Sequence, residues 1–207
     1  MERERELDPD ICGCILEFLL FNSADDLLVK KLIKAFPPFN LNPCSEKAIL
    51  LRSIQTQIQA GHITHKILDS LEMIHRIDSD QRLPIPDTMK EAYCAVALDC
   101  TAKFFTVDPN PNPDAVNRIW RGRVESLERS RASDLVSDLL RNRRRQVEAA
   151  FEDEEARRCL IAMNTRKEAI HRLRLYIGEA FASMGSPVLE RACLRFTSSQ
   201  DGQLQAH

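Results

Sequence analysis

The sequence has 207 residues, of which 43% are hydrophobic and 29% are charged, which is ordinary for one globular domain or two small ones. The formal net charge is −2, so the overall field does not favour nucleic acid. No apolar run reaches the roughly 18 residues that a membrane span needs, and the charged start MERERELDPD is not expected to act as a signal peptide.

Helices are the only regular elements that the sequence favours. It has six glycines and lacks the alternating Val, Ile and Thr runs that mark strands between hairpin turns. Apolar residues instead recur at helical spacing between Pro, Asn and Ser breaks. We therefore predict an all-α protein, an irregular bundle of about nine or ten helices over residues 10–196, with a charged tail at 1–9 and a disordered tail at 197–207.

The first predicted helix, from about Asp10 to Asn22, is apolar on more than one side. Its main face consists of Ile11, Cys14, Ile15, Phe18 and Leu19, and Leu16 and Leu20 extend that face laterally. A helix with such a wide apolar surface packs against more than one neighbour.

Three more helices are expected before residue 80, each bounded by ordinary start and stop residues. The second covers about 24–35 and is stopped by a Pro-Pro pair. The third begins at Ser45 as its N-cap and ends at Gly61, and the fourth covers about 64–77.

The helix from Asp87 to Phe105 is predicted to be the centre of the bundle. Its apolar ladder consists of Met89, Ala92, Tyr93, Val96, Ala97, Cys100 and Phe104. Residues 92–98 are apolar on nearly every side, which indicates a helix buried on several faces. No residue in this helix is a candidate for chemistry.

Five further helices complete the predicted bundle. They are a helix capped by Asp114 that carries AVNRIWRGRVESL, a helix from Ser133 or Asp134 to about Phe151, a short helix to about Met163, a long helix from Asn164 or Thr165 to Gly185, and a last helix to about Arg195. Their starts follow Ser, Asp or Asn caps or acidic first turns.

Enzyme signatures are missing from the sequence. It has no P-loop, no dinucleotide-binding glycine motif, no H-E-x-x-H and no G-x-S-x-G. The five histidines do not cluster, and histidines at the surface or core edge are the ordinary interpretation. We therefore expect no enzyme activity and no cofactor.

The seven cysteines are interpreted as free thiols in a reducing compartment. Most of them fall in apolar helical stripes, where cysteine behaves as a small core residue: Cys14, Cys94, Cys100, Cys159 and Cys193. Cys12 and Cys14 form a C-x-C pair, but the next candidates are far along the chain, so a zinc site is not expected.

A basic segment covers residues 118–145, where nine arginines stand against four acidic residues for a local charge of +5. It is a candidate for contact with phosphate or with an acidic partner, through Arg118, Arg121, Arg123, Arg143, Arg144 and Arg145. The alternative is a solvated face whose arginines pair with neighbouring carboxylates. Trp120, the only tryptophan, is interpreted as a core anchor in preference to a docking residue.

The last predicted helix has spare apolar surface, as the first one does. Its helical spacing groups Val188, Leu189, Ala192, Cys193 and Phe196. Terminal helices of this kind either complete the core or close a homodimer, and the sequence leaves both possibilities open.

Several unusual runs resemble the N-terminal region of plant telomere repeat-binding factor-like proteins. They are MKEAYCAVALDCTAKFF, DAVNRIWRGRVESL and SDLVSDLLRNRRRQVEAA, with AILLRSIQTQIQAGHITHKILDSLEMIHRI before them and NTRKEAIHRLRLYIGEAFASMG after them. The resemblance covers about Ile11 to Leu194. The same segments are more distantly similar to the helical homology domain of animal telomere repeat-binding factors.

This resemblance implies a fold of about nine or ten helices that homodimerises through its first and last helices and docks short peptides of partner proteins. It also implies a nuclear location. The plant family ends in a Myb-like DNA-binding domain with spaced tryptophans, whereas this sequence has one tryptophan in mid-chain. We therefore expect that DNA is bound only through a Myb-like domain that this chain lacks.

Two functional hypotheses follow. The first is a non-enzymatic nuclear domain that homodimerises and docks a protein partner for a telomere-repeat DNA-binding protein. Its predicted dimer interface joins Ile11, Cys14, Ile15, Phe18 and Leu19 to Leu189, Ala192, Cys193 and Phe196. The second is a monomeric helical adaptor that binds an acidic partner or nucleic acid through residues 118–145.

Overall fold

The computed structural model describes residues 9–22, 27–28, 31, 42–107 and 113–193. These residues form nine α-helices with defined bounds, a helical stretch at 188–193 and no strand, which confirms the predicted all-α fold. The predicted second helix lies almost entirely outside the described residues, as do residues 1–8, Phe196 and the tail at 197–207.

The chain divides into two compact units. The first consists of residues 1–52 and 180–207, and the second of residues 53–179. Two long helices, α3 (Pro43–Gln59) and α10 (Thr165–Met184), each contribute to both units.

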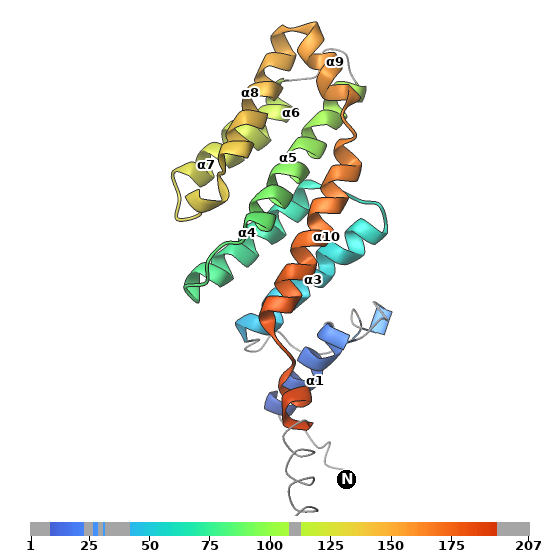
Figure 1. Ribbon diagram of the computed structural model, residues 1–207, viewed down its shortest axis with the longest axis vertical. Helices are drawn as coiled ribbons and strands as arrows, with labels where there is room; N and C mark the ends of the chain where they lie inside the picture. Colours follow the sequence, from blue (N-terminus) through green and yellow to red (C-terminus); the bar gives the residue numbers. More distant parts are fainter. Residues whose placement is uncertain (1–8, 23–26, 29–30, 32–41, 108–112, 194–207) are drawn as a thin grey trace, which may run out of the picture. The chain divides into compact units, whose positions relative to one another are not determined.

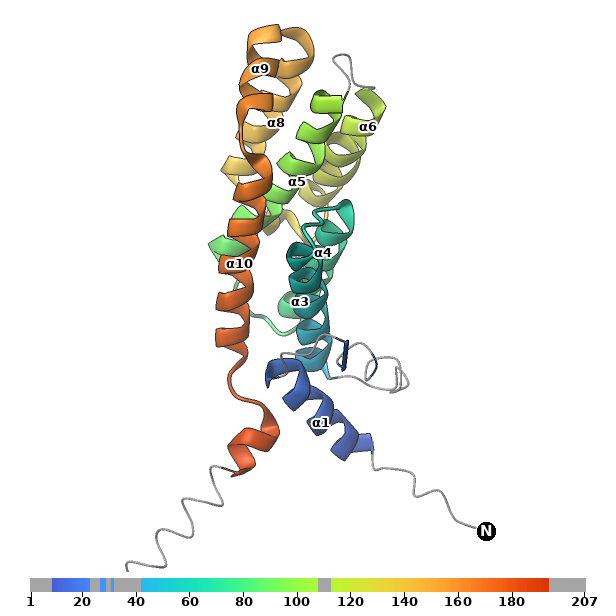
Figure 2. The same ribbon diagram turned by 90° about the vertical axis from the view of Figure 1, so that its right-hand side faces the viewer.

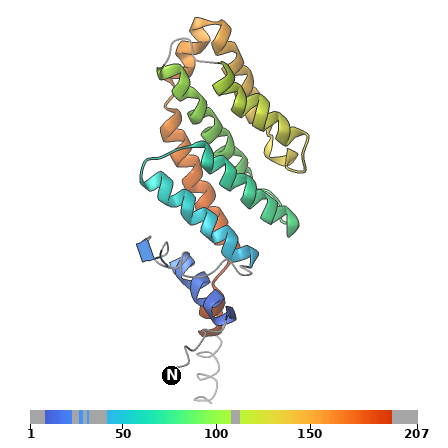
Figure 3. The same ribbon diagram turned by 180° about the vertical axis from the view of Figure 1, so that it is seen from behind.

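In the first unit, α1 (Pro9–Asn22) is held by a small apolar core. Leu16, Leu20 and Ala48 are buried together, and Phe21, Ile49, Phe181 and Met184 pack against them. The ring centroids of Phe21 and Phe181 lie 5.5 Å apart in an edge-on arrangement. Figure 3 shows α1 next to the first part of α3.

Arg52 of α3 binds the C-terminal end of α1. Its Nε donates to the carbonyl oxygen of Leu20 at 2.6 Å, and its guanidinium lies 5.6 Å from the centroid of the Phe181 ring. A cation at the carbonyl end of a helix is favourable because it satisfies free acceptors and opposes the negative end of the helix dipole.

The predicted start of the third helix was wrong. The helix begins at Pro43, and Asn42 is its cap, since the Ser45 amide donates to Asn42 Oδ1 at 2.7 Å. Proline fits the first helical position because its missing N–H would have no partner there. The predicted end is confirmed, because Gly61 has a φ of +70° and the amide of His62 donates to the carbonyl oxygen of Gln57.

The second unit is built around α5 (Asp87–Val107), which contacts α4 (His65–Asp80), α6 (Pro113–Asn117), α8 (Asp138–Glu152) and α9 (Glu154–Ala162). Figure 1 shows α5 between α4 and α8. Residues 92–98 are all buried, so the prediction of a buried central helix is confirmed. One ladder position differs: Phe104 is 37% exposed, and Phe105 is buried and packs on Phe151 of α8.

The predicted helix AVNRIWRGRVESL is helical, but not as one regular α-helix, and its predicted cap was wrong because Asp114 lies in the first turn of a helix that begins at Pro113. After α6, residues Arg118–Val124 wind as a π-helix, and α7 (Glu125–Glu128) follows. The π-helix buries Ile119, Trp120 and Val124 on one side and leaves Gly122 exposed on the other. π-turns are rare and concentrate at functional sites.

A helical hairpin, α8 and α9, completes this unit (Figure 2). The predicted start at Ser133 or Asp134 was wrong, because Ser133–Leu135 form a short 3₁₀ turn and α8 begins at Asp138. Its cap is Ser137, whose Oγ accepts from the Leu140 amide at 3.2 Å.

All seven cysteines are free thiols. Cys94 and Cys100 are buried, and burial raises the pKa of Cys94 to about 12 and that of Cys100 to about 11. The expectation of buried thiols was wrong for Cys159 and Cys193, which are exposed, because each lies on the solvent side of its helix.

Candidate functional site

The predicted dimer face of the first helix divides into two parts. Ile11, Ile15 and Phe18 are 54%, 37% and 37% exposed and follow one another at helical spacing; we call them the α1 apolar face. Cys14 and Leu19, beside them, are half-buried. The buried residues Leu16 and Leu20 therefore anchor the helix, while the described residues leave the α1 apolar face uncovered.

The predicted second half of the dimer face lies in the same unit. Leu189 and Ala192 are half-buried, Cys193 is exposed, and Phe196 lies outside the described residues. The pKa of the Cys44 thiol is raised by burial first and then by Glu17, while Lys47 and Arg191 act in the opposite direction. Charges on α1, on α3 and in the stretch 188–193 thus all act on this one thiol.

Two of the predicted contact arginines are engaged within the chain. Arg123 bonds to Asp69 and lies 3.3 Å from Glu72 Oε1, and Arg144 donates to Glu148 Oε1 at 3.0 Å. Burial works to lower the pKa of Arg123, but the bond to Asp69 and the charge of Glu72 outweigh it, so that pKa is raised. These two arginines are therefore neutralised inside the unit.

The other predicted arginines have no carboxylate partner among the described residues. Arg143 donates to Gln146 Oε1 at 2.7 Å and Arg145 to Asn142 Oδ1 at 3.4 Å, while Arg118 and Arg121 are exposed. Four of the six predicted contact arginines therefore keep an unpaired positive charge among the described residues.

Trp120 is a core residue, as the sequence favoured. It is 2% exposed, and its Nε1 donates to Thr101 Oγ1 on α5 at 2.8 Å. Thr101 in turn donates to the carbonyl oxygen of Ala97 at 2.8 Å. The tryptophan therefore fixes the π-helix on the central helix and is not available for stacking with a ligand.

A polar cleft of about 590 Å³ lies in the second unit between α4 and residues 122–132. Its lining is Glu72, His75, Arg76, Ser79, Asp80, Gly122, Arg123, Ser126, Leu127, Ser130, Arg131 and Ala132. The sequence did not reveal this cleft, because its two walls are more than 40 residues apart and no motif joins them. The only sequence feature that coincides with the cleft is the unusual run RIWRGRV, whose Gly122 and Arg123 belong to the lining.

His75 lies at the inner side of the cleft and is 3% exposed. Burial lowers its pKa, against the opposing charges of Asp134, Asp78 and Glu72, so the imidazole is neutral at pH 7. Its Nε2 lies 3.5 Å from Ser79 Oγ.

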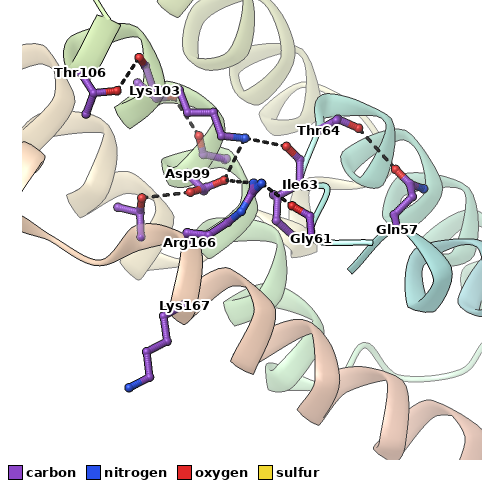
Figure 4. A network of polar contacts seen from close by, with 12 residues as sticks. Gln57, Gly61, Ile63, Thr64, Asp99, Lys103, Thr106, Arg166 and Lys167 are labelled. Atoms are coloured by element: carbon purple, nitrogen blue, oxygen red, sulfur yellow. Dashed lines mark hydrogen bonds and ion pairs between the residues drawn. The ribbon is translucent and has the colours of Figure 1, made fainter. Parts of the chain in front are cut away.

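Figure 4 shows a buried polar network that joins α5, α10 and the loop after α3. Asp99, whose side chain is 3% exposed, pairs with Lys103 and Arg166, each at 3.1 Å, and accepts from Thr165 Oγ1 at 3.0 Å. Lys103 also donates to the carbonyl oxygen of Ile63 at 2.6 Å, and Arg166 bonds to that of Gly61. Because these groups already bond to one another, we assign the network a structural role.

Comparisons of the chain with protein-family models, curated proteins and solved structures found no match. Among the described residues, no helix has the length and apolarity needed to cross a membrane. Nor do any three His, Cys, Asp or Glu side chains within those residues come together as metal ligands.

Proposed function

We propose that this chain is a non-enzymatic interaction module that homodimerises through the first unit. The observation that carries the proposal is the α1 apolar face, because three large apolar side chains on one exposed helical face are a typical protein-contact surface. Leu16 and Leu20 pack the opposite side of α1 into the core of the first unit. A partner can therefore bind the α1 apolar face while α1 stays packed.

The resemblance to telomere repeat-binding factor-like proteins supports the same proposal and extends it. It implies that the dimer is nuclear, that it serves a telomere-repeat DNA-binding protein, and that DNA is bound by a Myb-like domain. The alternative of a monomeric adaptor using the basic segment loses two of its six predicted contacts, since Arg123 and Arg144 already pair with carboxylates.

Burial of the α1 apolar face alone does not supply enough free energy for a dimer, so the predicted contacts from the last helix are needed as well. Complete burial of an Ile or Phe side chain is worth about 1.5–3 kcal/mol, and these side chains are already about half buried, so each gains about 1 kcal/mol. A two-fold dimer buries six of them, for about 6 kcal/mol against an association cost of about 4–15 kcal/mol. Leu189, Ala192 and neighbouring residues must therefore contribute to the same interface.

Paired variants test the proposal. We expect Ile15→Glu to dissociate the dimer, because it places a charge in an apolar interface. Ile161→Glu on α9 is the matched control, since Ile161 is 40% exposed and lies in the other unit. Sedimentation velocity over a dilution series should show dissociation for the first variant alone; equal behaviour of the two variants contradicts an interface on α1.

A further inference from the structure

Two arginines of the polar cleft are available to a ligand. Arg76 lies on α4 and Arg131 follows α7 on the opposite wall, and both are exposed. Within the described residues neither has a carboxylate at ion-pair distance. A guanidinium that has no internal partner keeps all its donors for an oxyanion, which it can bind in a forked, two-bond geometry.

The rest of the lining adds a hydroxyl and free space. Ser126 is exposed in the lining and carries a hydroxyl, and Gly122 in the π-helix has no side chain to occupy the cleft. A Cβ added at Gly122 would meet only the Asn117 carbonyl oxygen, at 3.8 Å, so the wall has room there. The cleft volume of about 590 Å³ is ample for several side chains of a bound peptide.

We propose that this cleft docks an acidic segment of a protein partner, with one carboxylate or phosphate group held between Arg76 and Arg131. The lining has three guanidiniums against two carboxylates, and Glu72 is already occupied by Arg123 and by the hydroxyl of Tyr93 at 2.7 Å. With the Glu72–Arg123 pair set aside, the lining keeps Arg76 and Arg131 against Asp80, and this excess of positive charge favours an anion at the two arginines.

The acidic residues at the cleft select a peptide over a nucleic acid. Asp80 lines the cleft, and Asp134 and Asp78 are close enough to influence the titration of His75. A nucleic acid would bring a continuous row of phosphates next to these carboxylates. A peptide can place one anion at the arginines and neutral residues beside the carboxylates, which avoids that repulsion.

The test uses the full chain and three fluorescein-labelled pools of random-sequence peptides, with a fixed central phosphoserine, glutamate or serine. We expect both anionic pools to bind, measured by fluorescence anisotropy, and the serine pool to fail. Arg76→Ala with Arg131→Ala should weaken binding about tenfold or more, since two charge-assisted contacts are lost. The stronger of the two anionic pools tells whether phosphate or carboxylate is the preferred group.

Two further variants separate the cleft from general electrostatics. Arg118→Ala with Arg121→Ala removes the same charge outside the cleft and should change binding less than about twofold. Gly122→Gln fills the cleft without changing charge and should weaken binding as the cleft double variant does. Circular dichroism checks that each variant is folded.

Three results would overturn the proposal. The first is equal weakening of peptide binding by the two double arginine variants, and the second is binding of the serine pool as tight as that of the anionic pools. The third is a single-stranded oligonucleotide that binds more tightly than the peptides and no longer binds when Arg76 and Arg131 are replaced. The proposal does not rest on the dimer. The Ile15→Glu variant should bind the peptides unchanged, so failure of one proposal is distinguishable from failure of the other.

Discussion

Replacing Asp99 should strongly destabilise the second unit, because this carboxylate is the centre of the buried polar network. Asp99→Asn keeps the shape of the side chain and removes its charge, so Lys103 and Arg166 lose the carboxylate that joins them. The bond from Thr165 Oγ1 is weakened at the same time, because an ionised acceptor becomes neutral. The network ties three segments of the unit together, as Figure 4 shows.

The magnitude follows from the exposure of the partners. Removing one member of a fully buried ion pair costs about 3–5 kcal/mol. Here Lys103 and Arg166 are 45% and 39% exposed, so water can partly replace the lost carboxylate. We therefore expect Asp99→Asn to lower the free energy of unfolding by about 2–3 kcal/mol.

Urea unfolding followed by far-UV circular dichroism measures this difference. The matched control is Asp87→Asn, because Asp87 pairs with Lys90 at 2.9 Å but its side chain is 90% exposed. Its loss should cost about 0–0.5 kcal/mol. If the two variants unfold at the same urea concentration with equal slopes, the reasoning about the buried network is refuted.

Three other changes test the local structure. Arg82→Gly should raise the free energy of unfolding by about 0.5–1 kcal/mol in urea melts, because Arg82 has a φ of +58° at the end of α4, where glycine carries no steric penalty; a loss of stability contradicts this. Trp120→Phe should lower the same free energy by about 1–3 kcal/mol, since it removes buried volume and the bond to Thr101, and an unchanged melt would place Trp120 outside the core. Because burial lowers the pKa of His75, the native state binds fewer protons than the unfolded state below about pH 6.5. The free energy of unfolding should therefore decrease as the pH is lowered from about 7 to about 5, and this pH dependence should be weaker in His75→Gln. An equal pH dependence in the variant contradicts the lowered pKa.

The spacing of apolar residues and the residues that start and stop helices predicted much of the fold. The buried run at 92–98 identified α5 as the centre, and the ends of α3 and α10 were predicted at Gly61 and Gly185, which have φ values of +70° and +73°. Such features depend on a few neighbouring residues, and local sequence is sufficient to specify them.

Features that depend on contacts between distant residues were not predictable. Two partners of Asp99, Thr165 and Arg166, come from α10, and the partners of Arg123 are on α4, so no local sequence pattern indicates these contacts. Ser45 and Asn42 are both good caps, and the choice between them depends on whether Pro43 starts the helix. The polar cleft was missed for the same reason, because Arg76 and Arg131 become neighbours of one cavity only in the folded unit.

The most direct test of the central proposal is the mass of the full chain in solution. Multi-angle light scattering at a concentration on the order of 10 µM should give twice the chain mass of 23.7 kDa. Ile15→Glu should return the mass to that of one chain, while Ile161→Glu keeps the dimer. A wild-type protein that remains a single chain at this concentration contradicts dimerisation through the α1 apolar face.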